Sequence, residues 1–299
     1  MAIRHDSISF LSDLGAVDGT VGLVKAIVRD LAPHAAVVDL THDIPAYDVR
    51  AGGLALARAI GYVPAGVVLA VVDAGERRPV AIEVAGGNGV IVGPDNGLLA
   101  TAVALAGGAD RAVVLDRVEH HLPSPGAVLQ VRDVFAPVAA HLCNGVDLAD
   151  LGTLVDADTL LPGVVPLPTV PPELAATGGV QAQVLWIDRW GNCQLNVGPD
   201  ELVPWGGAVG AALQIAAGDN VRVVHRVEHT GQLGAGAVGL VLDPFGMLAL
   251  AVDRRSAADE LQLAPGDQVT ITPLAEGAAG SAAGVVSTPV TLTSPTQRR

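Results

Sequence analysis

Short apolar runs alternate with longer segments of helical spacing through the first half of the chain, and this alternation limits the possible folds more than any other feature. The apolar runs are 7–15, 35–41, 66–75, 80–86 and 89–96, and the helical segments are 18–32, 49–63 and 97–107. Strands that are apolar throughout are buried on both faces, which is typical of a layered α/β domain with a mainly parallel sheet. We predict this fold for residues 1–165.

The second half of the chain has a different pattern. Residues 166–179 are rich in proline and lack periodicity, which predicts a linker. Short β-like runs follow, with one helix-like stretch at 256–263, and they predict a smaller β-barrel-like domain over 180–275. These runs are 180–188, 211–218, 220–227, 237–253 and 268–274. Residues 276–299 are mostly Ala, Gly, Ser, Thr and Pro, so we expect a flexible tail there.

Charge and hydropathy restrict the possible partners. The net charge of −14 argues against binding to nucleic acid or to anionic membranes. Half of the residues are hydrophobic, yet no stretch approaches the roughly 18–20 uninterrupted apolar residues that a bilayer span needs. The first ten residues lack a cationic segment followed by an apolar one. We therefore expect a cytoplasmic protein without a membrane partner.

The scarce residue types give no sign of a metal or a cofactor. Cys143 and Cys193 do not form a C-x-x-C motif, which disfavours both a disulfide framework and a cysteine metal site. The glycines at 86–93 stand between two strands rather than at the start of a helix, and neither a Walker A nor an H-E-x-x-H pattern occurs. Lys25 is the only lysine beside sixteen arginines, which we interpret as codon bias.

Four aspartates fall at or near the ends of predicted strands. In open α/β sheets, the residues that bind ligands lie just beyond the carboxyl ends of the strands. A single aspartate there is weak support, because aspartate also caps helices and stabilises turns. Four in succession predict a rim of carboxylates along one edge of the sheet. They are Asp13, Asp39, Asp73 and Asp95.

Several motifs recur in an order that resembles one family. They are "FLSDLG" (10–15), "VVDAGERR" (71–78), "GPDNGLL" (93–99), "RDVFAP" (132–137), "IDRWGNCQLN" (187–196) and "LDPFGMLALAVDRRSAADEL" (242–261). Together they resemble the S-adenosylmethionine hydroxide adenosyltransferases, which are relatives of fluorinating and chlorinating enzymes. The resemblance extends from about residue 7 to about residue 272. It implies an N-terminal α/β domain, a C-terminal barrel-like domain and a homotrimer that binds S-adenosylmethionine between the N-domain of one subunit and the C-domain of the next.

The resemblance also implies a set of substrate-binding residues. Asp13 stands where the family's carboxylate binds both ribose hydroxyls, and a carboxylate can accept two such hydrogen bonds. Thr20 and Asp188 match positions near the methionine amino group, where a negative charge pairs with an ammonium. The remaining positions match residues around the adenine, the sugar and the sulfur, or lie in the C-terminal stretch. They are Tyr47, Trp190, Asn192, Phe245, Asp253 and Arg254.

The same comparison assigns three residues to the pocket of the attacking water. Asp73 matches the family's Asp, and Arg77 matches its Arg, with Arg78 as a possible substitute. The loop between them is about three residues shorter than the family's pattern. Gln130 occupies the slot of the family's His, within a segment, 128–137, that we expect to be an apolar strand. Gln130 could instead only satisfy nearby backbone groups.

The activity that the resemblance implies is hydrolysis of S-adenosylmethionine to adenosine and L-methionine, with no cofactor. Water or hydroxide attacks C5′, Asp73 orients it or accepts its proton, and Arg77 stabilises its charge. A glutamine cannot take a proton, so we expect slower hydrolysis than in relatives that carry histidine. A binding protein for adenosine or S-adenosylmethionine, without catalysis, is the alternative. A halogenase is disfavoured, because the Asp73 carboxylate would repel a halide. A third alternative is a scaffold protein that binds no ligand. It would require the matches at the ribose, adenine and methionine positions all to be coincidental.

Overall fold

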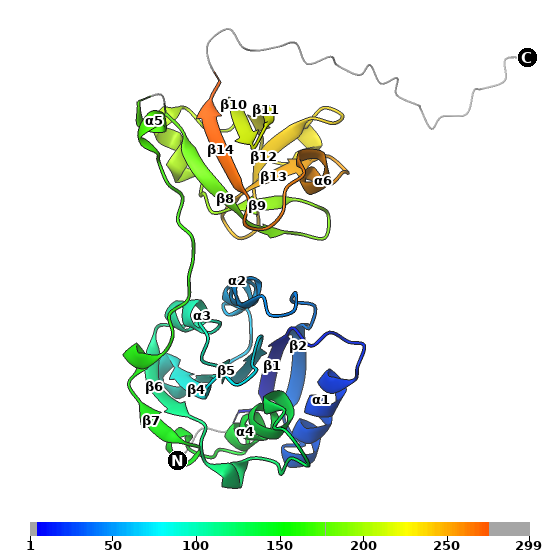
Figure 1. Cartoon of the computed structure of the whole chain (residues 1–299), viewed down its shortest axis with the longest axis vertical. Helices are drawn as coiled ribbons and strands as arrows, with labels where there is room; N and C mark the ends of the chain where they lie inside the picture. Colours follow the sequence, from blue (N-terminus) through cyan, green and yellow to red (C-terminus); the bar gives the residue numbers. More distant parts are fainter. Residues whose placement is uncertain (1–4, 177, 275–299) are drawn as a thin grey trace, which may run out of the picture. The chain divides into compact units, whose positions relative to one another are not determined.

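The computed structural model describes residues 5–176 and 178–274 (Figure 1), and the predicted tail at 276–299 lies outside the described residues. The chain divides into two compact units, Met1–Val165 and Pro166–Arg299. Each unit has its own cluster of buried apolar side chains.

The N-terminal unit is built on one seven-stranded sheet with the order β2-β1-β3-β5-β4-β6-β7. The pairs β2–β1, β1–β3 and β3–β5 are parallel, whereas β5–β4, β4–β6 and β6–β7 are antiparallel. Five strands therefore run in one direction, and the predicted α/β class with a mainly parallel sheet is confirmed. The bounds are β1 Ser7–Ser12, β2 Ala36–Thr41, β3 Val67–Val71, β4 Pro79–Val84, β5 Gly89–Pro94, β6 Ala109–Val114 and β7 Thr153–Val155.

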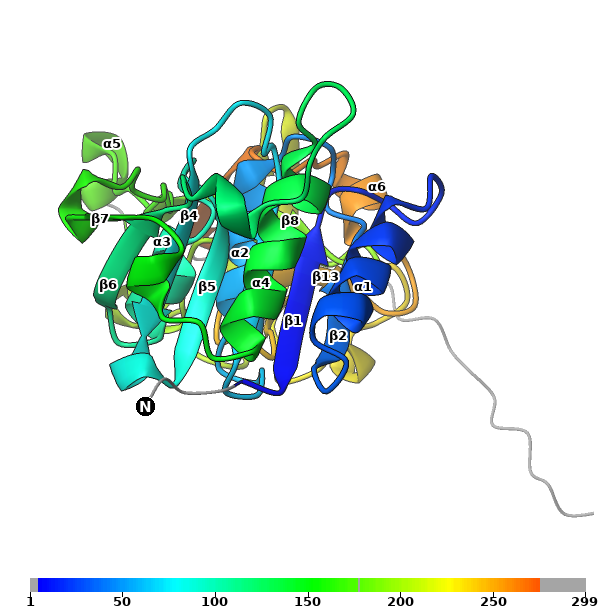
Figure 2. The ribbon, with the colours of Figure 1, turned by 90° about the horizontal axis from the view of Figure 1, so that it is seen from below.

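Helices cover both faces of this sheet (Figures 1 and 2). Helices α1 (Thr20–Leu31) and α4 (Ala136–Cys143) contact each other on one face, and α2 (Val49–Ala59) and α3 (Ala100–Leu105) contact each other on the opposite face. This two-sided burial explains the continuous apolar strands, since β1 and β3 are buried along their whole length. Within 5–176 and 178–274, no helix combines the length and hydropathy of a bilayer-spanning segment.

Residues 128–137 do not form the predicted strand, so that prediction was wrong. A helical segment begins at Gln130 and passes through a π-helical turn, η3 (Val131–Phe135), into α4. The apolar positions 131, 134, 135 and 138 recur every three to four residues, and all four are buried. That spacing suits one face of a helix better than a strand. Single π turns within helices often accompany functional sites.

The C-terminal unit is a closed seven-stranded barrel with the order β10-β11-β12-β13-β9-β8-β14, as predicted from its short runs. The run 237–253 forms two antiparallel strands, β12 and β13, rather than one. The bounds are β8 Val180–Ile187, β9 Cys193–Leu195, β10 Ala212–Ala217, β11 Asn220–Arg226, β12 Val238–Leu242, β13 Leu248–Val252 and β14 Gln268–Pro273. Helix α6 (Ala257–Leu261) follows β13, and its N-cap Ser256 accepts the N–H of Asp259 at 3.0 Å.

Part of the proline-rich segment is attached to the barrel. Thr169 and Gln181 exchange backbone hydrogen bonds of 2.8 and 3.0 Å, and the Asn196 side chain donates to the carbonyl of Pro166 at 3.1 Å. A short helix, α5 (Pro172–Ala175), begins at Pro172, where the missing N–H of proline has no cost.

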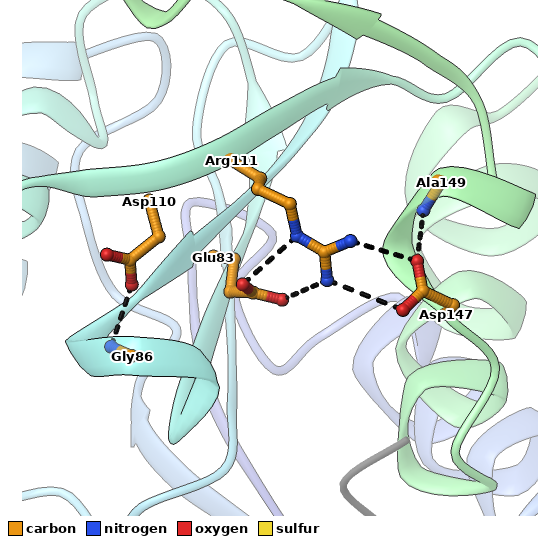
Figure 3. A network of polar contacts seen from close by, with 6 residues as sticks. All are labelled: Glu83, Gly86, Asp110, Arg111, Asp147 and Ala149. Atoms are coloured by element: carbon orange, nitrogen blue, oxygen red, sulfur yellow. Dashed lines mark hydrogen bonds and ion pairs between the residues drawn. The ribbon is translucent and has the colours of Figure 1, made fainter. Parts of the chain in front are cut away.

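A charged network joins β4, β6 and the following loops in the N-terminal unit (Figure 3). Arg111 on β6 stands opposite Glu83 on β4 and donates to both of its carboxylate oxygens. Arg111 also donates to Asp147 at 3.0 Å, and Asp147 accepts the N–H of Ala149. The hydrogen bonds that Arg111 donates to both carboxylates raise the pKa of Arg111. Arginine suits this position, because its planar group can meet two carboxylates at once.

Candidate active site

Asp13 directly follows β1 at the carboxyl edge of the sheet. One carboxylate oxygen, Oδ2, accepts the backbone N–H groups of Tyr47 at 3.0 Å and Asp73 at 3.2 Å. The other oxygen, Oδ1, has no hydrogen-bond partner within the described part of the chain. The side chain is half-buried. A carboxylate with one anchored oxygen and one available oxygen can accept a hydrogen bond from a ligand hydroxyl.

Both residues that donate to Asp13 have strained backbones. Tyr47 has a φ of 66° and Asp73 a φ of 47°, in the left-handed region that non-glycine residues rarely adopt. Such a conformation costs about 1–3 kcal/mol per residue and is concentrated at functional sites. Among the described residues only five other than glycine have a positive φ, and three of these were predicted as site residues from the sequence. The five are Tyr47, Asp73, Ala85, Arg254 and Gln262.

The two adjacent arginines have different partners. Arg77 lies 3.3 Å from the Asp73 carboxylate and is largely exposed. Arg78 donates to the carboxylate of Asp95, which is buried and also accepts the N–H of Leu161 at 2.7 Å. The geometry therefore brings Arg77, rather than Arg78, next to Asp73.

Gln130 completes this cluster from the start of the helical segment. Its Nε2 donates to the backbone carbonyl of Arg77 at 2.8 Å. Since a carbonyl can only accept, the amide nitrogen must face it, and Oε1 must point elsewhere. Oε1 is buried and has no hydrogen-bond partner among the residues that the structure describes. A buried acceptor of this kind usually receives a hydrogen bond, often from an ordered water.

The Arg132–Asp133 pair holds this segment by ion pairing. Arg132 donates to both carboxylate oxygens of Asp133, at 2.5 and 2.9 Å, and Asp133 also accepts the N–H of Leu129 at 2.8 Å. The hydrogen bond from Arg132 is the largest cause of a lowered pKa of Asp133. The carboxylate thereby fixes the backbone just before Gln130.

Asn96 lies within the "GPDNGLL" motif, and no role was predicted for it from the sequence. Its Nδ2 donates to the carbonyls of Val72 at 2.9 Å and Asp73 at 3.2 Å. Its Oδ1 accepts the N–H of Leu98. Asn96 thus holds the strained Asp73 turn from the neighbouring strand β5. The only signal in the sequence was its place directly after a strand-end aspartate.

The predicted rim of carboxylates divides into two kinds of position. Asp13 and Asp73 meet through the hydrogen bond described above. Asp39 instead pairs with Lys25 and His42, and Asp95 pairs with Arg78. Thr20 begins helix α1, and its N–H binds Asp18 at 3.0 Å. No hydrogen bond joins Thr20 to the Asp13 cluster among the described residues.

On the barrel, Asp188 organises a tight turn. Its Oδ1 accepts the N–H groups of Trp190 and Asn192, both at 2.9 Å, and its Oδ2 accepts the Asn192 side chain at 2.8 Å. Gly191 has a φ of 82°, and a Cβ at this position would lie 2.2 Å from the Ser256 hydroxyl. The turn therefore requires glycine, and it presents the Trp190 ring to solvent.

A second barrel turn joins β12 to β13 and carries Phe245. Asp243 accepts the N–H groups of Phe245 at 2.8 Å and Met247 at 3.0 Å, which closes the turn. Asp253 and Arg254 follow β13 directly. Neither has an ion pair within residues 5–176 and 178–274.

The aromatic residues have an unusual distribution. Aromatics make up only 3% of the chain. Even so, Tyr47 is 77% exposed, Trp190 70% and Phe245 50%. Tyr62 is exposed as well, at 85%, so what distinguishes Tyr47, Trp190 and Phe245 is their place in the family resemblance rather than exposure alone.

The protein belongs to the class of two-domain proteins that combine an α/β unit with a β-barrel. Its candidate site has carboxylates at the edge of the α/β sheet and exposed aromatic rings on turns of the barrel. Two family models match the chain: the SAM hydroxide adenosyltransferase N-terminal domain over residues 8–152 and the SAM hydroxide adenosyltransferase C-terminal domain over residues 182–270. The chain belongs to the SAM hydroxide adenosyltransferase family, which confirms the resemblance seen in its motifs.

Several curated proteins are similar over most of their length. An (R)-S-adenosyl-L-methionine hydrolase of Salinispora arenicola is 41% identical over 272 residues, which cover 89% of this chain and 97% of the relative. A protein of the same name from Thermus thermophilus is 40% identical, with 88% and 98% covered. A fluorinase of an Actinoplanes species is 24% identical, with 89% and 97% covered.

Two solved structures have the same fold. An uncharacterized conserved protein from Thermotoga maritima has a TM-score of 0.78 at 26% identity, with 89% of this chain and 99% of that chain covered. A conserved hypothetical protein from Thermus thermophilus has a TM-score of 0.67 at 35% identity, with 90% and 100% covered.

Proposed function

We propose that the protein hydrolyses S-adenosyl-L-methionine to adenosine and L-methionine. Water attacks C5′, a C–O bond forms there, and the C5′–S bond breaks. Its electron pair goes to sulfur, so the sulfonium becomes the neutral thioether of methionine. The leaving group therefore needs no acid, and the proton lost from the water is the only one to be removed. The similarity to curated hydrolases at 40–41% identity supports this activity.

The observation that carries the proposal is the cluster of Asp13, Asp73, Arg77 and Gln130. Asp13 binds the Asp73 backbone, Asp73 pairs with Arg77, and Gln130 binds the Arg77 carbonyl. This arrangement brings together the groups that the reaction needs. The Asp13 carboxylate can bind a diol, the Asp73 carboxylate and the Arg77 guanidinium can act on a nucleophile, and the Gln130 amide oxygen is a buried hydrogen-bond acceptor. Holding reacting groups in place before the reaction supplies much of an enzyme's rate enhancement.

Each member of the cluster has a role in the proposed reaction. Asp13 accepts hydrogen bonds from the ribose hydroxyls. Asp73 orients the attacking water or accepts its proton, and Arg77 stabilises the developing hydroxide. The unpartnered Oε1 of Gln130 accepts the second hydrogen of the water. Glutamine cannot remove a proton, so Asp73 is the base among the three residues assigned to the attacking water.

The barrel turns supply the remaining proposed contacts. Trp190 covers the adenine, Asn192 binds its edge, and Asp188 lies near the methionine ammonium. Tyr47 lines the sugar and sulfur end, with Thr20 as a further contact to the amino group. Phe245, Asp253 and Arg254 complete the proposed set from the turns around β13. The exposure of Trp190 supports this assignment, because a largely exposed indole offers area for a flat ligand to cover, and Arg189 lies 5.9 Å from the centroid of its ring.

A binding protein without catalysis is the second candidate. The observation in its favour is Gln130, which offers hydrogen bonds but no basic group. Such a protein would bind adenosine or S-adenosylmethionine and release no product. The short 73–78 loop and the exposed Arg77 side chain are compatible with it.

The proposed assembly is a homotrimer, as the family resemblance implies, with S-adenosylmethionine between the N-domain of one subunit and the C-domain of the next. The division of the proposed contacts between two compact units supports it. Light scattering coupled to size exclusion tests the trimer, and a monomer of 30.1 kDa would contradict it. The proposed location is the cytoplasm. Cys143 and Cys193 are buried free thiols whose pKa burial raises to about 12, as suits proteins of reducing compartments.

The decisive experiment is a product assay in H₂¹⁸O. The protein is incubated with S-adenosylmethionine, and adenosine and methionine are separated by chromatography. The proposal predicts equal amounts of both products and one ¹⁸O in the 5′-hydroxyl of adenosine. Binding in calorimetry without any product would favour the second candidate. Absence of binding to both compounds would contradict both.

A further inference from the structure

Four polar side chains form a hydrogen-bonded chain beside Asp13. The hydroxyl of Ser12 lies 2.8 Å from Nδ1 of His42. Nε2 of His42 lies 3.1 Å from Oδ1 of Asp39, and Oδ2 of Asp39 lies 2.5 Å from the ammonium of Lys25. The chain joins the end of β1, the end of β2 and helix α1. Of its members, only Asp39 was given a role from the sequence, as part of the predicted carboxylate rim.

The order Ser–His–Asp superficially matches that of a hydrolytic triad, but the burial of Ser12 excludes that role. Ser12 is 0% exposed, so its hydroxyl cannot reach a substrate. The His42 ring is also enclosed, and its edge packs against Phe10 with the ring centroids 4.6 Å apart. These groups can act on a ligand only through the backbone that they hold.

The backbone that they hold is the turn that carries Asp13. Ser12 precedes Asp13, and the N–H of Leu14 donates to the Ser12 hydroxyl at 3.4 Å. The N–H of Gly15 donates to the carbonyl of His42 at 2.8 Å. His42 therefore contacts the turn on both sides of Asp13, once through its ring and once through its backbone.

The direction of the hydrogen bonds follows from the acceptor at the far end. A carboxylate can only accept, so Nε2 of His42 carries a hydrogen and donates it to Asp39. In the neutral ring Nδ1 then accepts the hydrogen of Ser12. Although burial raises the pKa of Asp39, hydrogen bonds from Lys25 and His42 lower it overall, so this acceptor stays charged at neutral pH.

Lys25 is the only lysine in the sequence. Codon bias accounts for the sixteen arginines, but it leaves the one remaining lysine unexplained. That lysine stands 2.5 Å from Asp39, at the end of the hydrogen-bonded chain. An ammonium is a compact point charge, whereas a guanidinium is a wide planar fork, so the two groups place their charge differently.

We infer that Lys25, Asp39, His42 and Ser12 are positioning residues that fix the Asp13 carboxylate for the ribose diol. This inference rests on the proposed function, because it assumes that Asp13 binds the diol. The chain sets the place of Asp13 relative to Tyr47 and Asp73, which both donate to it. Loss of the chain weakens ligands that carry the diol and spares ligands that lack it.

The first test compares adenosine with 2′,3′-dideoxyadenosine in calorimetry. In His42→Gln the side-chain amide takes the place of Nε2, so the hydrogen bond to Asp39 is kept and the hydrogen bond to Ser12 is lost. In His42→Asn the amide takes the place of Nδ1, so the hydrogen bond to Ser12 is kept and the hydrogen bond to Asp39 is lost. We expect His42→Gln to weaken adenosine by a factor of about three to ten, the equivalent of the neutral hydrogen bond to Ser12 that it loses. We expect His42→Asn to weaken it less, and both variants to bind the dideoxynucleoside like the wild type. Equal weakening of both nucleosides would overturn the inference.

The second test needs no ligand. Amide hydrogen exchange is measured at Tyr47 and Asp73, whose N–H groups bind Asp13. We expect at least about tenfold faster exchange there in His42→Gln, since the hydrogen bonds that protect these amides loosen, and no change at Val68 in β3. His34→Gln, which alters a surface histidine bonded to the Cys143 carbonyl, is the matched control.

The two tests separate the possible failures. A wild type that binds no adenosine refutes the proposed function, whereas the exchange rates still report on the positioning of Asp13. Unchanged exchange at Tyr47 and Asp73 in His42→Gln overturns the inference, whatever the protein binds. Lys25→Arg gives a second variant with the charge preserved, and it should also accelerate exchange at both amides.

Discussion

The carboxylate of Asp13 accepts the backbone N–H of Asp73 at 3.2 Å, although the two residues are sixty positions apart in the chain. Through this bond, the side chain proposed to bind the ribose also holds the strained backbone of the residue proposed to act on water. The same oxygen holds Tyr47 at 3.0 Å. Substrate binding and arrangement of the nucleophile site therefore depend on one carboxylate.

Asp13→Asn is expected to weaken adenosine binding by about ten- to a hundredfold. The substitution removes a charged acceptor, which is worth about 1.5–3 kcal/mol per hydrogen bond, and each 1.4 kcal/mol corresponds to about tenfold in affinity. Calorimetry with adenosine measures the effect. Asp30→Asn on the exposed face of α1 is the control and should bind like the wild type. Wild-type affinity in Asp13→Asn would remove Asp13 from the site.

Gln130→His is expected to raise the turnover of S-adenosylmethionine. An imidazole at this position can accept the proton of the attacking water, and a general base typically contributes about 10²–10⁴ in rate. The variant should also gain a pH dependence, with activity rising as the pH rises through about 6.5, where an unperturbed imidazole loses its proton. Initial rates of adenosine formation between pH 5 and 9 measure both effects. Gln232→His on the barrel serves as the control. A rate at or below that of the wild type would count against this place for Gln130.

Arg77→Ala and Arg78→Ala are expected to fail in different ways. Arg77 is exposed beside Asp73, so its loss should lower kcat by about 10²–10³ and leave stability nearly unchanged. Loss of Arg78 leaves the buried Asp95 without its cation and should cost about 1–3 kcal/mol of unfolding free energy. Urea denaturation and steady-state kinetics on both variants separate these effects. The reverse pattern would make Arg78 the working arginine.

Gly191→Ala is expected to destabilise the barrel and to abolish adenosine binding through Trp190 and Asn192. Its Cβ would lie 2.2 Å from the Ser256 hydroxyl, in addition to the cost of a positive φ. Gly206→Ala is a matched control, since Gly206 has a φ of 85° and open space around the added Cβ. Thermal unfolding should show a clearly larger loss for Gly191→Ala, because only this variant adds a steric clash. Equal losses would mean that the turn can move to accept a side chain.

Acid should weaken the N-terminal unit through Asp147 and Asp133. The N–H of Ala149 and then Arg111 lower the pKa of Asp147, and Arg132 lowers that of Asp133. A lowered pKa in the folded state means that the stabilisation is fully present above the unfolded pKa, about 3.9. It is lost as the pH falls through the folded value. Urea midpoints measured from pH 6 to pH 3 should therefore fall, and less steeply in Asp147→Asn. The control is Asp150→Asn, which should keep the slope of the wild type.

The fold could be predicted for the strands whose burial determines both their place in the sheet and their hydrophobic pattern. Strands β1 and β3 are buried on both faces, and this burial is what made their sequences continuously apolar. Strand β6 was missed because Asp110 and Arg111 interrupt its apolar run. The structure pairs Arg111 with Glu83 on the neighbouring strand and with Asp147 (Figure 3), and such partners cannot be read from the sequence alone.

The sequence predicted which residues belong to the candidate site, but not how these residues contact one another. The strand-end rule and the motifs pointed to Asp13 and Asp73, but they did not reveal that one oxygen of Asp13 binds two strained amides. Backbone strain depends on contacts between distant segments, and no local pattern records it. For the same reason the rim of four aspartates could not be divided in advance. Asp39 and Asp95 are paired with Lys25 and Arg78, which lie 14 and 17 positions away along the chain.

The seven-stranded barrel closes on itself, and this closure has a consequence for how ligand preference can change. Every barrel strand is hydrogen-bonded on both sides, so the turns at 188–192, 243–247 and 253–256 can vary without unpairing any strand. Libraries randomised at the exposed residues of these turns, with Gly191 kept, should therefore remain folded. Under the proposed contacts of Trp190 and Asn192 with the adenine, such libraries offer a route to variants that accept sulfonium compounds with altered bases.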